Sequence, residues 1–171
     1  AGQVAGGVLK KGDEVVVLPS GMTSKIAGID LFDKEIDQAF PPMSVTIRLE
    51  DDLDVSRGDM IARVNNAPTR GQDIDAMICW MTTEPLRPRQ KLAIKHTTRT
   101  GRALVKDIQY RLDINTLHRD MEQNELGLNQ IGRVKLRTTV PLLADEYSKN
   151  RISGSFILID EATGVTVGAG M

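Results

Sequence analysis

The sequence predicts an all-β fold with two small antiparallel β-barrels in tandem. Short segments in which apolar residues alternate with polar ones, or run unbroken, recur along the 171 residues, and amphipathic helical patterns are absent. Turn-forming residues separate these segments at the close intervals typical of small barrels. The length is sufficient for two such domains, and with only six aromatic residues their cores must consist mainly of Val, Ile, Leu and Met.

The first barrel is expected over residues 1–67. Its strands are expected in the segments 4–9, 15–18, 23–29, 45–49 and 60–64. The turn Lys11-Gly12-Asp13 predicts that the first two segments pair as a hairpin. The third segment is expected to break at Asp30, whereas strict alternation over 45–49 predicts a half-buried strand.

The second barrel is expected over residues 74–171. The stretch 65–72 contains turn formers and little that a core could bury, so a linker is expected at this boundary, over 68–73. A polar connection with a helical turn is expected over 113–129. The strands are expected in the segments 74–81, 91–96, 102–112, 134–140, 156–159 and 164–171.

Two of these strands carry more specific predictions. In segment 102–112 the apolar positions change from odd to even numbers, which requires an extra residue, so we expect a β-bulge near Lys106-Asp107. The segment Phe156 to Ile159 is apolar without a break. A strand of this kind is expected to be covered on both faces.

Charge and cysteine content limit the classes of function. The net charge is −1, with −3 on residues 1–70 and +2 on residues 71–171, so general nucleic-acid binding is not expected. The single cysteine, Cys79, cannot form an internal disulfide, which suits the reducing cytoplasm. No apolar run approaches the roughly 20 residues that cross a bilayer, and no signal segment opens the chain.

Motifs for catalysis are missing from the sequence. It has no phosphate-binding Gly-x-x-x-x-Gly-Lys-Ser/Thr loop, no Cys/His cluster with metal-ligand spacing and no Gly-x-Ser-x-Gly elbow. His96 and His118 have no Ser or Cys partner nearby in sequence. We therefore assign no catalytic, cofactor-binding or metal-binding residue and expect the chain itself not to be an enzyme.

Several polar motifs are interpreted as surface features. The acidic run Glu50 to Asp54 lacks the glycine turn of a calcium loop and is expected at a solvated hairpin tip between strands 45–49 and 60–64. Arg57-Gly58-Asp59 is interpreted as a β-turn rather than an adhesion motif. His118-Arg119-Asp120 lacks the downstream residues of a kinase catalytic loop and is also expected at the surface.

Two further features leave alternatives open. Cys79 and Trp80 are neighbours in a strand and face opposite sides, so one is expected in the core and the other at an interface, although a lone strand cysteine is usually buried. A basic cluster is either a solvated barrel face or a docking surface for an acidic partner. It consists of Arg87, Arg89, Lys91, Lys95, Arg99 and Arg102.

Several segments resemble one protein family. They are Lys11-Gly12-Asp13-Glu14-Val15, the stretches 39–46 and 54–59, the region 124–134, and Gly154-Ser155-Phe156-Ile157-Leu158-Ile159-Asp160. Together they resemble the C-terminal barrels of the GTPase subunit (subunit 1) of bacterial sulfate adenylyltransferase, or ATP sulfurylase, in the translation-factor-like GTPase superfamily. This resemblance implies barrels like domains II and III of elongation factor Tu.

The resemblance also implies a parent enzyme and its partners. GTP and Mg would bind an upstream domain absent from this chain, and a small catalytic subunit would form adenosine 5′-phosphosulfate from ATP and sulfate. The barrels would be the platform on which the GTPase domain moves. The start at Ala1 without an initiator Met is expected for a chain that continues upstream. The alternatives are tRNA-binding barrels of an elongation-factor-like GTPase and a stand-alone two-barrel adaptor.

Overall fold

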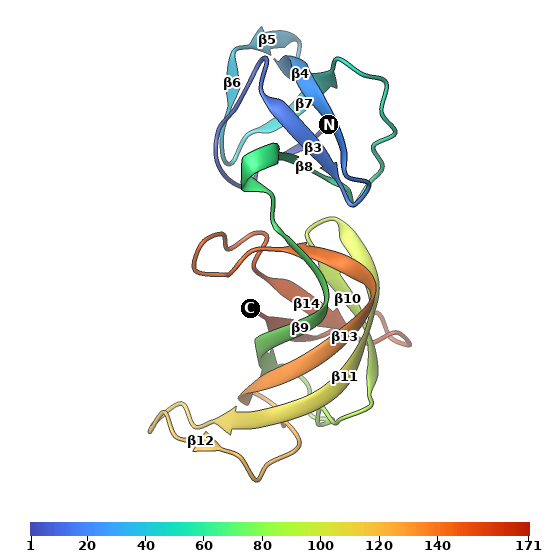
Figure 1. Ribbon diagram of the computed structural model, residues 1–171. Coiled ribbons are helices and arrows are strands. Elements are labelled where there is room, and N and C mark those ends of the chain that lie inside the picture. The colour runs from blue at the N-terminus through green and yellow to red at the C-terminus, as the bar shows by residue number, and fades with distance from the viewer. The chain divides into compact units, whose positions relative to one another are not determined.

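The structure is a computed structural model that describes all residues, 1–171. The chain divides into two compact units, Ala1–Thr69 and Arg70–Met171, and both consist of β-strands (Figure 1). The one helical element is the three-residue 3-10 helix η1, Val64–Asn66. The all-β prediction is therefore confirmed. No helix has the length and apolar character needed to cross a membrane.

The first unit contains eight short strands. They are β1 (Gly2–Gln3), β2 (Leu9–Lys10), β3 (Glu14–Leu18), β4 (Met22–Leu31), β5 (Lys34–Ile36), β6 (Gln38–Ala39), β7 (Ser44–Leu49) and β8 (Met60–Arg63). Five of them form the sheet order β1-β7-β4-β3-β8, β5 pairs with β4, and β2 pairs with β6 in a separate ribbon. All these pairs are antiparallel.

The core of the first unit is small and aliphatic. Its buried members are Val4, Val15, Ile26, Ile29, Ala39 and Val45. The predicted alternation over 45–49 is confirmed, because Val45 is buried, Ile47 and Leu49 are half-buried, and the residues between them are exposed. Alternate residues of β3 and β4 face the same core, which is the pattern of a sheet with one face exposed to solvent.

The predicted hairpin between segments 4–9 and 15–18 is wrong. The turn at Lys11-Gly12 exists, but β2 pairs with β6 and β3 pairs with β4 and β8. The turn redirects the chain because the Asp13 carboxylate accepts the Lys10 amide and the Gly12 amide, at φ +85°, donates to the Ile26 carbonyl. The turn is therefore present, but the strands on its two sides pair with other strands and not with each other.

Two other features of the first unit differ from the sequence predictions. β4 continues to Leu31 instead of breaking at Asp30, and forms an unforeseen hairpin with β5 through Phe32-Asp33. The acidic run 50–54 does not lie at a hairpin tip, because β7 pairs with β1 and β4 whereas β8 pairs with β3. Alternation predicts which face is buried and carries no information about the neighbouring strand.

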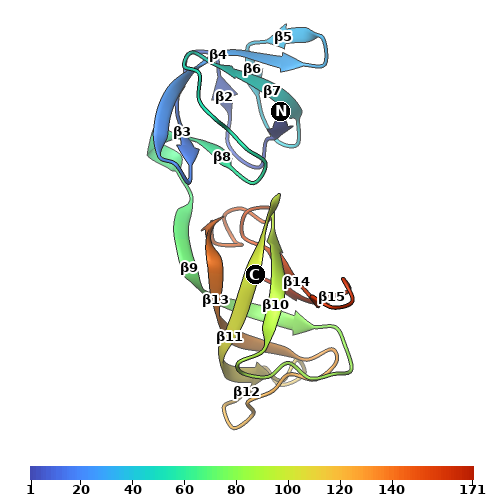
Figure 2. The same ribbon diagram turned by 90° about the vertical axis from the view of Figure 1, so that its right-hand side faces the viewer.

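The second unit is a closed barrel. Its strands are β9 (Thr69–Trp80), β10 (Lys91–His96), β11 (Arg99–Leu112), β12 (Arg119–Asp120), β13 (Ile131–Ala144), β14 (Phe156–Ile159) and β15 (Thr166–Gly170). The order β10-β14-β15-β9-β13-β11 is closed by pairing between β10 and β11. β11 extends beyond the barrel and ends in a hairpin with β12 (Figures 1 and 2). Residues 69–73, expected as linker, form the start of β9.

The inward-facing residues of this barrel form one continuous core. It includes residues from every barrel strand: Ala76, Ile78, Trp80, Leu92, Ile94, Ala103, Val105, Ile108, Val134, Leu136, Leu142, Phe156, Leu158 and Val167. Trp80 is its largest member at 1% exposure, and its indole N–H donates to the Glu84 carbonyl at 2.6 Å. The single tryptophan is thus fully buried with its polar atom satisfied.

The bulge predicted near Lys106-Asp107 is confirmed. The register between β11 and β13 shifts between Val105 and Asp107, and again between Ile108 and Tyr110. As a result, both Val105 and Ile108 face the core although their numbers differ in parity. The connection 113–129 contains turns and the short strand β12, which the sequence analysis did not foresee.

The strand β14 differs from the prediction on one face. Phe156 and Leu158 are buried in the core, but Ile157 and Ile159 point outward and are only half-buried. Both isoleucines remain partly accessible to solvent. The expectation that this strand is covered on both faces is therefore wrong for the chain as it stands.

A tight turn before β14 explains the local sequence. The Asn150 side-chain oxygen accepts the amides of Ile152 and Ser153, and its carbonyl accepts the Gly154 amide. A Cβ on Gly154 would lie 2.5–2.6 Å from backbone atoms of Tyr147 and Asn150. Only glycine fits this close approach of two chain segments.

We expect Gly154→Ala to destabilise the chain by about 1–3 kcal/mol, because the added methyl group meets backbone that cannot rotate away. Urea unfolding followed by circular dichroism measures the change. The control is Gly127→Ala, whose new Cβ would find its nearest neighbour, the Gln130 side chain, at 3.5 Å. Equal stability of the two variants would contradict the proposed clash.

Candidate functional site

The two histidines lie apart and in different environments. His96 is buried at 2% exposure at the end of β10, and His118 is exposed in the loop before β12. The His96 Nε2 atom lies 2.7 Å from the Ser153 carbonyl oxygen, which can only accept, so this nitrogen carries the proton. The Ser153 hydroxyl in turn donates to the Asp145 carboxylate at 2.6 Å.

This His96–Ser153–Asp145 group is a structural link rather than a catalytic triad. A triad requires the histidine to accept a proton from the serine hydroxyl, and here the histidine donates to the serine main chain. The link connects β10 to the turn that precedes β14. Sequence reasoning missed it because His96 is 57 residues away from Ser153 in the chain and the three residues share no motif.

The other polar motifs also serve the local structure. Ser56 to Asp59 form the predicted turn, with the Asp59 amide donating to the Ser56 carbonyl at 3.0 Å. The Asp51 side chain accepts the Ser24 hydroxyl at 2.8 Å and thereby attaches the acidic run to β4. No group of three potential ligands among His, Cys, Asp and Glu could hold a metal ion.

The motif His118-Arg119-Asp120 stabilises the hairpin between β11 and β12. The Arg119 guanidinium lies 5.1 Å from the Tyr110 ring centre, and Arg111 forms an ion pair with Asp120 at 2.9 Å. The predicted surface location is confirmed for His118 and Arg119, which are exposed. These contacts fix the projecting hairpin seen at the end of β11 (Figure 1).

Cys79 and Trp80 face opposite sides of β9, as predicted. Trp80 is in the core, whereas Cys79 is half-exposed on the outside of the barrel. Cys79 is therefore not the buried residue that its type suggests.

A hollow of about 250 Å³ opens beside Trp80. It is lined by Trp80, Thr82, Glu84, Gln90, Leu92, Asp160, Thr163, Val165 and Val167.

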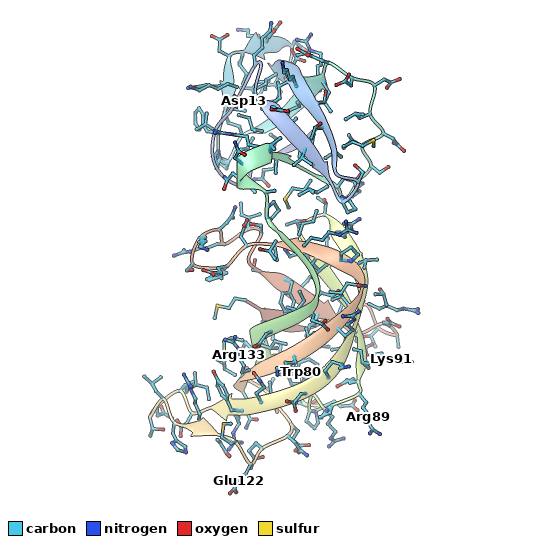
Figure 3. The ribbon with its side chains drawn as sticks, viewed as in Figure 1. Asp13, Trp80, Arg89, Lys91, Glu122 and Arg133 are labelled. Atoms are coloured by element: carbon cyan, nitrogen blue, oxygen red, sulfur yellow. The ribbon has the colours of Figure 1, made fainter.

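The basic cluster divides into paired and unpaired members. Arg87 forms an ion pair with Glu125 at 3.0 Å, and Arg102 forms one with Glu161 at 2.9 Å. Lys91 and Lys95 are exposed on the outer side of β10, and neither has an ion-pair partner. Figure 3 shows Arg89 and Lys91 projecting outward from this part of the second unit. The two lysines of the cluster that lack an ion pair are thus both on β10.

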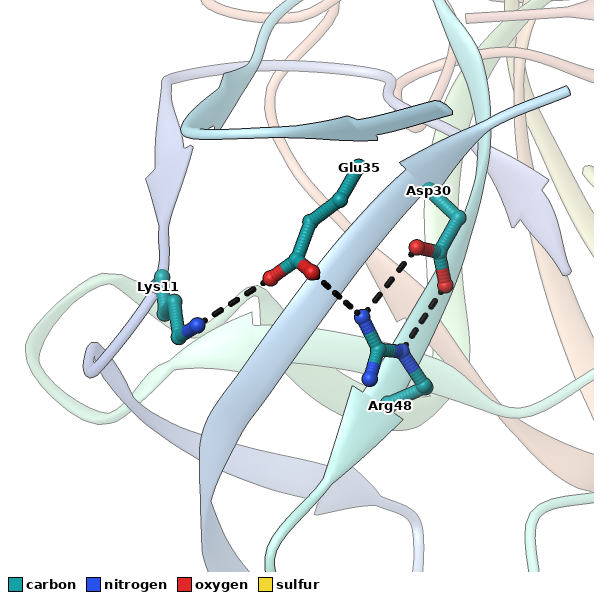
Figure 4. A network of polar contacts seen from close by, with 4 residues as sticks. All are labelled: Lys11, Asp30, Glu35 and Arg48. Atoms are coloured by element: carbon teal, nitrogen blue, oxygen red, sulfur yellow. Dashed lines mark hydrogen bonds and ion pairs between the residues drawn. The ribbon is translucent and has the colours of Figure 1, made fainter. Parts of the chain in front are cut away.

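A second charged feature, in the first unit, was not foreseen. The Arg48 guanidinium contacts the two oxygens of Asp30 at 2.9 and 3.2 Å and one oxygen of Glu35 at 3.2 Å. The other Glu35 oxygen is 3.1 Å from the Lys11 ammonium (Figure 4). This four-residue network joins β4, β5 and β7 to the turn after β2. It depends on cross-strand register, which local sequence does not reveal.

The network shifts the ionisation of its central carboxyl group. The hydrogen bond and charge of Lys11, followed by those of Arg48, hold the pKa of Glu35 below its usual range. Because the folded pKa is lowered, ionised Glu35 stabilises the first unit at neutral pH. This contribution is lost as the pH falls through the folded pKa of Glu35.

We expect Lys11→Met to raise the pKa of Glu35 back towards its usual range, as measured by NMR titration of the side-chain carboxyl carbon. The neighbouring Lys10→Met is the control, since Lys10 is outside the network, and it should leave the titration of Glu35 almost unchanged. All four side chains are at the surface, so added salt should reduce the difference between the two variants. An unchanged pKa in Lys11→Met would contradict the network.

We expect His96→Leu to lower the free energy of unfolding by about 1–3 kcal/mol, because the buried Ser153 carbonyl loses its donor. The matched control is His118→Leu, an exposed histidine in the same unit, with an expected change within about 0.5 kcal/mol. Chemical denaturation of both variants tests the structural role. A negligible effect of His96→Leu would show that the link is dispensable.

Comparison with known proteins identifies the family. Residues 73–171, which make up most of the second unit, match the family described as GTP-eEF1A C-terminal domain-like. A solved structure of Sup35 complexed with GDP superposes with a TM-score of 0.87 at 21% identity, covering 99% of this chain and 42% of that one. This likeness confirms the translation-factor type of barrel fold.

Relatives with higher identity cover the whole chain. It is 56% identical over 172 residues to the bifunctional enzyme CysN/CysC of Mycobacterium tuberculosis, and 44% identical over 178 residues to sulfate adenylyltransferase subunit 1 of Bacteroides thetaiotaomicron. It spans 28% of the first protein and 37% of the second, so it corresponds to about a third of their length. The chain therefore belongs to the GTP-eEF1A C-terminal domain-like family, as a relative of sulfate adenylyltransferase subunit 1.

Proposed function

We propose that this chain is the two-barrel part of the GTP-hydrolysing subunit of ATP sulfurylase, acting in sulfate assimilation. The observation that carries this proposal is the identity of 44% or more, over 99–100% of the chain, to CysN/CysC and to sulfate adenylyltransferase subunit 1. The resemblance noted in the 54–59 and 154–160 segments supports the same branch of the superfamily.

Within that subunit the chain is proposed to be non-catalytic. Its residues do not fit a nucleotide or metal site, because it has no phosphate-binding loop and no group of three possible metal ligands. We therefore assign GTP and Mg to a part of the parent protein that this chain does not include. The parent subunit would hydrolyse GTP, and its small partner subunit would transfer the adenylyl group of ATP to sulfate in the cytoplasm.

The barrels are proposed to be a platform for these steps. We take residues 1–67 and 74–171 as its two domains, with 68–73 as the connection. Coupling of GTP hydrolysis to adenylyl transfer requires that the platform contacts different surfaces of the GTPase domain in its two nucleotide states. A closed barrel with a continuous core suits this role, since packed cores transmit displacement without deforming.

We expect the complete parent subunit and the small subunit together to form adenosine 5′-phosphosulfate from ATP and sulfate, with a rate that GTP increases. A parent subunit from which these 171 residues are deleted should retain GTP binding and lose the GTP stimulation. The readout is product formation with and without GTP, with GTP binding as the control for folding of the remaining domain.

The alternative, tRNA-binding barrels of an elongation-factor-like GTPase, predicts a different result. RNA affinity would be measurable at low salt and would fall steeply with increasing salt, with a slope set by the phosphates contacted. We expect no such binding through these barrels, given that the net charge of the 171 residues is −1. Strong, salt-dependent RNA binding together with no adenosine 5′-phosphosulfate formation would overturn the proposed function.

A further inference from the structure

The hollow beside Trp80 lies where two connections of the second barrel meet. Ala93 on β10 pairs with Ile159 on β14, so the start of β10 lies beside the connection from β14 to β15. Gly168 on β15 pairs with Trp80 on β9, which brings the same connection close to the end of β9. The strand register of the closed barrel therefore places this hollow of about 250 Å³.

Three of the lining residues are apolar members of the barrel core. They are Trp80, Leu92 and Val167, with exposures of 1%, 1% and 7%. The indole N–H of Trp80 already donates to the Glu84 carbonyl, so the ring offers apolar surface and no free donor. A hydrocarbon segment gains free energy by burial against such a surface. Sites for whole small molecules typically measure about 300–1,000 Å³, so this hollow suits a ligand of side-chain size rather than a nucleotide.

The charged part of the lining is entirely negative. Glu84 and Asp160 line the hollow, and no lining residue is basic, although residues 71–171 carry a net charge of +2. Neither carboxylate has an ion-pair partner, whereas the adjacent Glu161 is paired with Arg102 at 2.9 Å. The hollow thus combines apolar surface with two uncompensated carboxylates. This combination disfavours an anion and suits a cation that also carries hydrocarbon.

The turn that follows β14 holds Asp160 in its charged form. Its Oδ1 atom accepts the Thr163 amide at 2.7 Å, the Thr163 hydroxyl at 2.8 Å and the Ala162 amide at 3.1 Å. The bonds from Thr163, followed by that from Ala162, hold the pKa of Asp160 below its usual range. All three donors reach Oδ1, so Oδ2 keeps its capacity to accept a hydrogen bond from a ligand.

We propose that the hollow beside Trp80 binds an organic cation, a guanidinium or ammonium group on a short aliphatic stem, with the stem against Trp80 and Leu92 and the charge at Glu84 and Asp160. A bare metal ion is a poorer occupant, because no group of three possible ligands is present. The group can belong to a free small molecule or to an arginine or lysine side chain of the parent subunit. The site itself does not depend on the proposed function.

The single tryptophan of the chain is a reporter within the site. A nitrogen–proton correlation spectrum of the 171-residue chain contains one indole signal, that of Trp80, whose N–H is bonded to the Glu84 carbonyl. We expect butylguanidinium to shift this signal to saturation, with half the shift at a concentration on the order of 1 mM for a ligand of this size. Butylurea has the same shape without the charge and should require a concentration about tenfold higher.

Two variants remove the charges and keep the shapes of the side chains. We expect Glu84→Gln and Asp160→Asn each to weaken the binding of butylguanidinium about threefold or more and to leave that of butylurea unchanged, because only the cation loses a partner. Asparagine at position 160 retains an oxygen that can accept the bonds from Thr163. Glu122→Gln is the matched control, since Glu122 is an exposed acid far from Trp80 in Figure 3, and it should alter affinity less than about twofold.

The complete parent subunit, with its other tryptophans replaced, separates the two sources of the cation. If butylguanidinium shifts the Trp80 signal there as it does in the chain, the hollow is a site for a free cation. If that signal already lies at its cation-bound position and no longer responds, a basic side chain of the parent occupies the site.

Three results would overturn the proposal. They are a Trp80 signal that does not reach saturation in the 171-residue chain, equal binding of butylurea and butylguanidinium, and equal weakening by Glu122→Gln and the two variants of the lining. None of them bears on the proposed function, which is tested by adenosine 5′-phosphosulfate formation.

Discussion

The closure of the second barrel by β10 is the constraint on which the rest of this unit depends. β10 pairs with β11 along one edge and with β14 along the other, so the six barrel strands have no open edge. Closure fixes the inward direction of Leu92 and Ile94, and through register that of Leu158. The two bulges in β11 supply the bending that a small closed sheet needs.

Closure also explains why the turn before β14 is so closely packed. β14 has only four residues, and its position beside β10 is reinforced by the hydrogen bond from His96 to the Ser153 carbonyl. Gly154 allows the chain to cross the backbone of Tyr147 before the strand begins. One segment that carries the family resemblance, 154–160, thus begins at a residue whose type is restricted by main-chain geometry.

The sequence predicted local features well and pairing poorly. The strand 45–49, the bulge near Lys106 and the opposite directions of Cys79 and Trp80 follow from period-two geometry, and all three are confirmed. The hairpin of segment 4–9 is wrong because alternation does not specify the neighbouring strand. For the same reason the Arg48 network and the His96 link could not be predicted, since their partners meet only through register.

The error on β14 is informative about the exterior of the barrel. An unbroken apolar strand was expected to be covered on both sides, and the barrel covers only Phe156 and Leu158. Stability of the barrel does not require Ile157 and Ile159 on its exterior, because β13, a more distant strand of the same barrel, places arginine and lysine at outward positions and is still packed into the same core. Apolar residues on the exterior of β14 are therefore not a requirement of the closed barrel, and an unbroken apolar run does not by itself predict that both faces of a strand are buried.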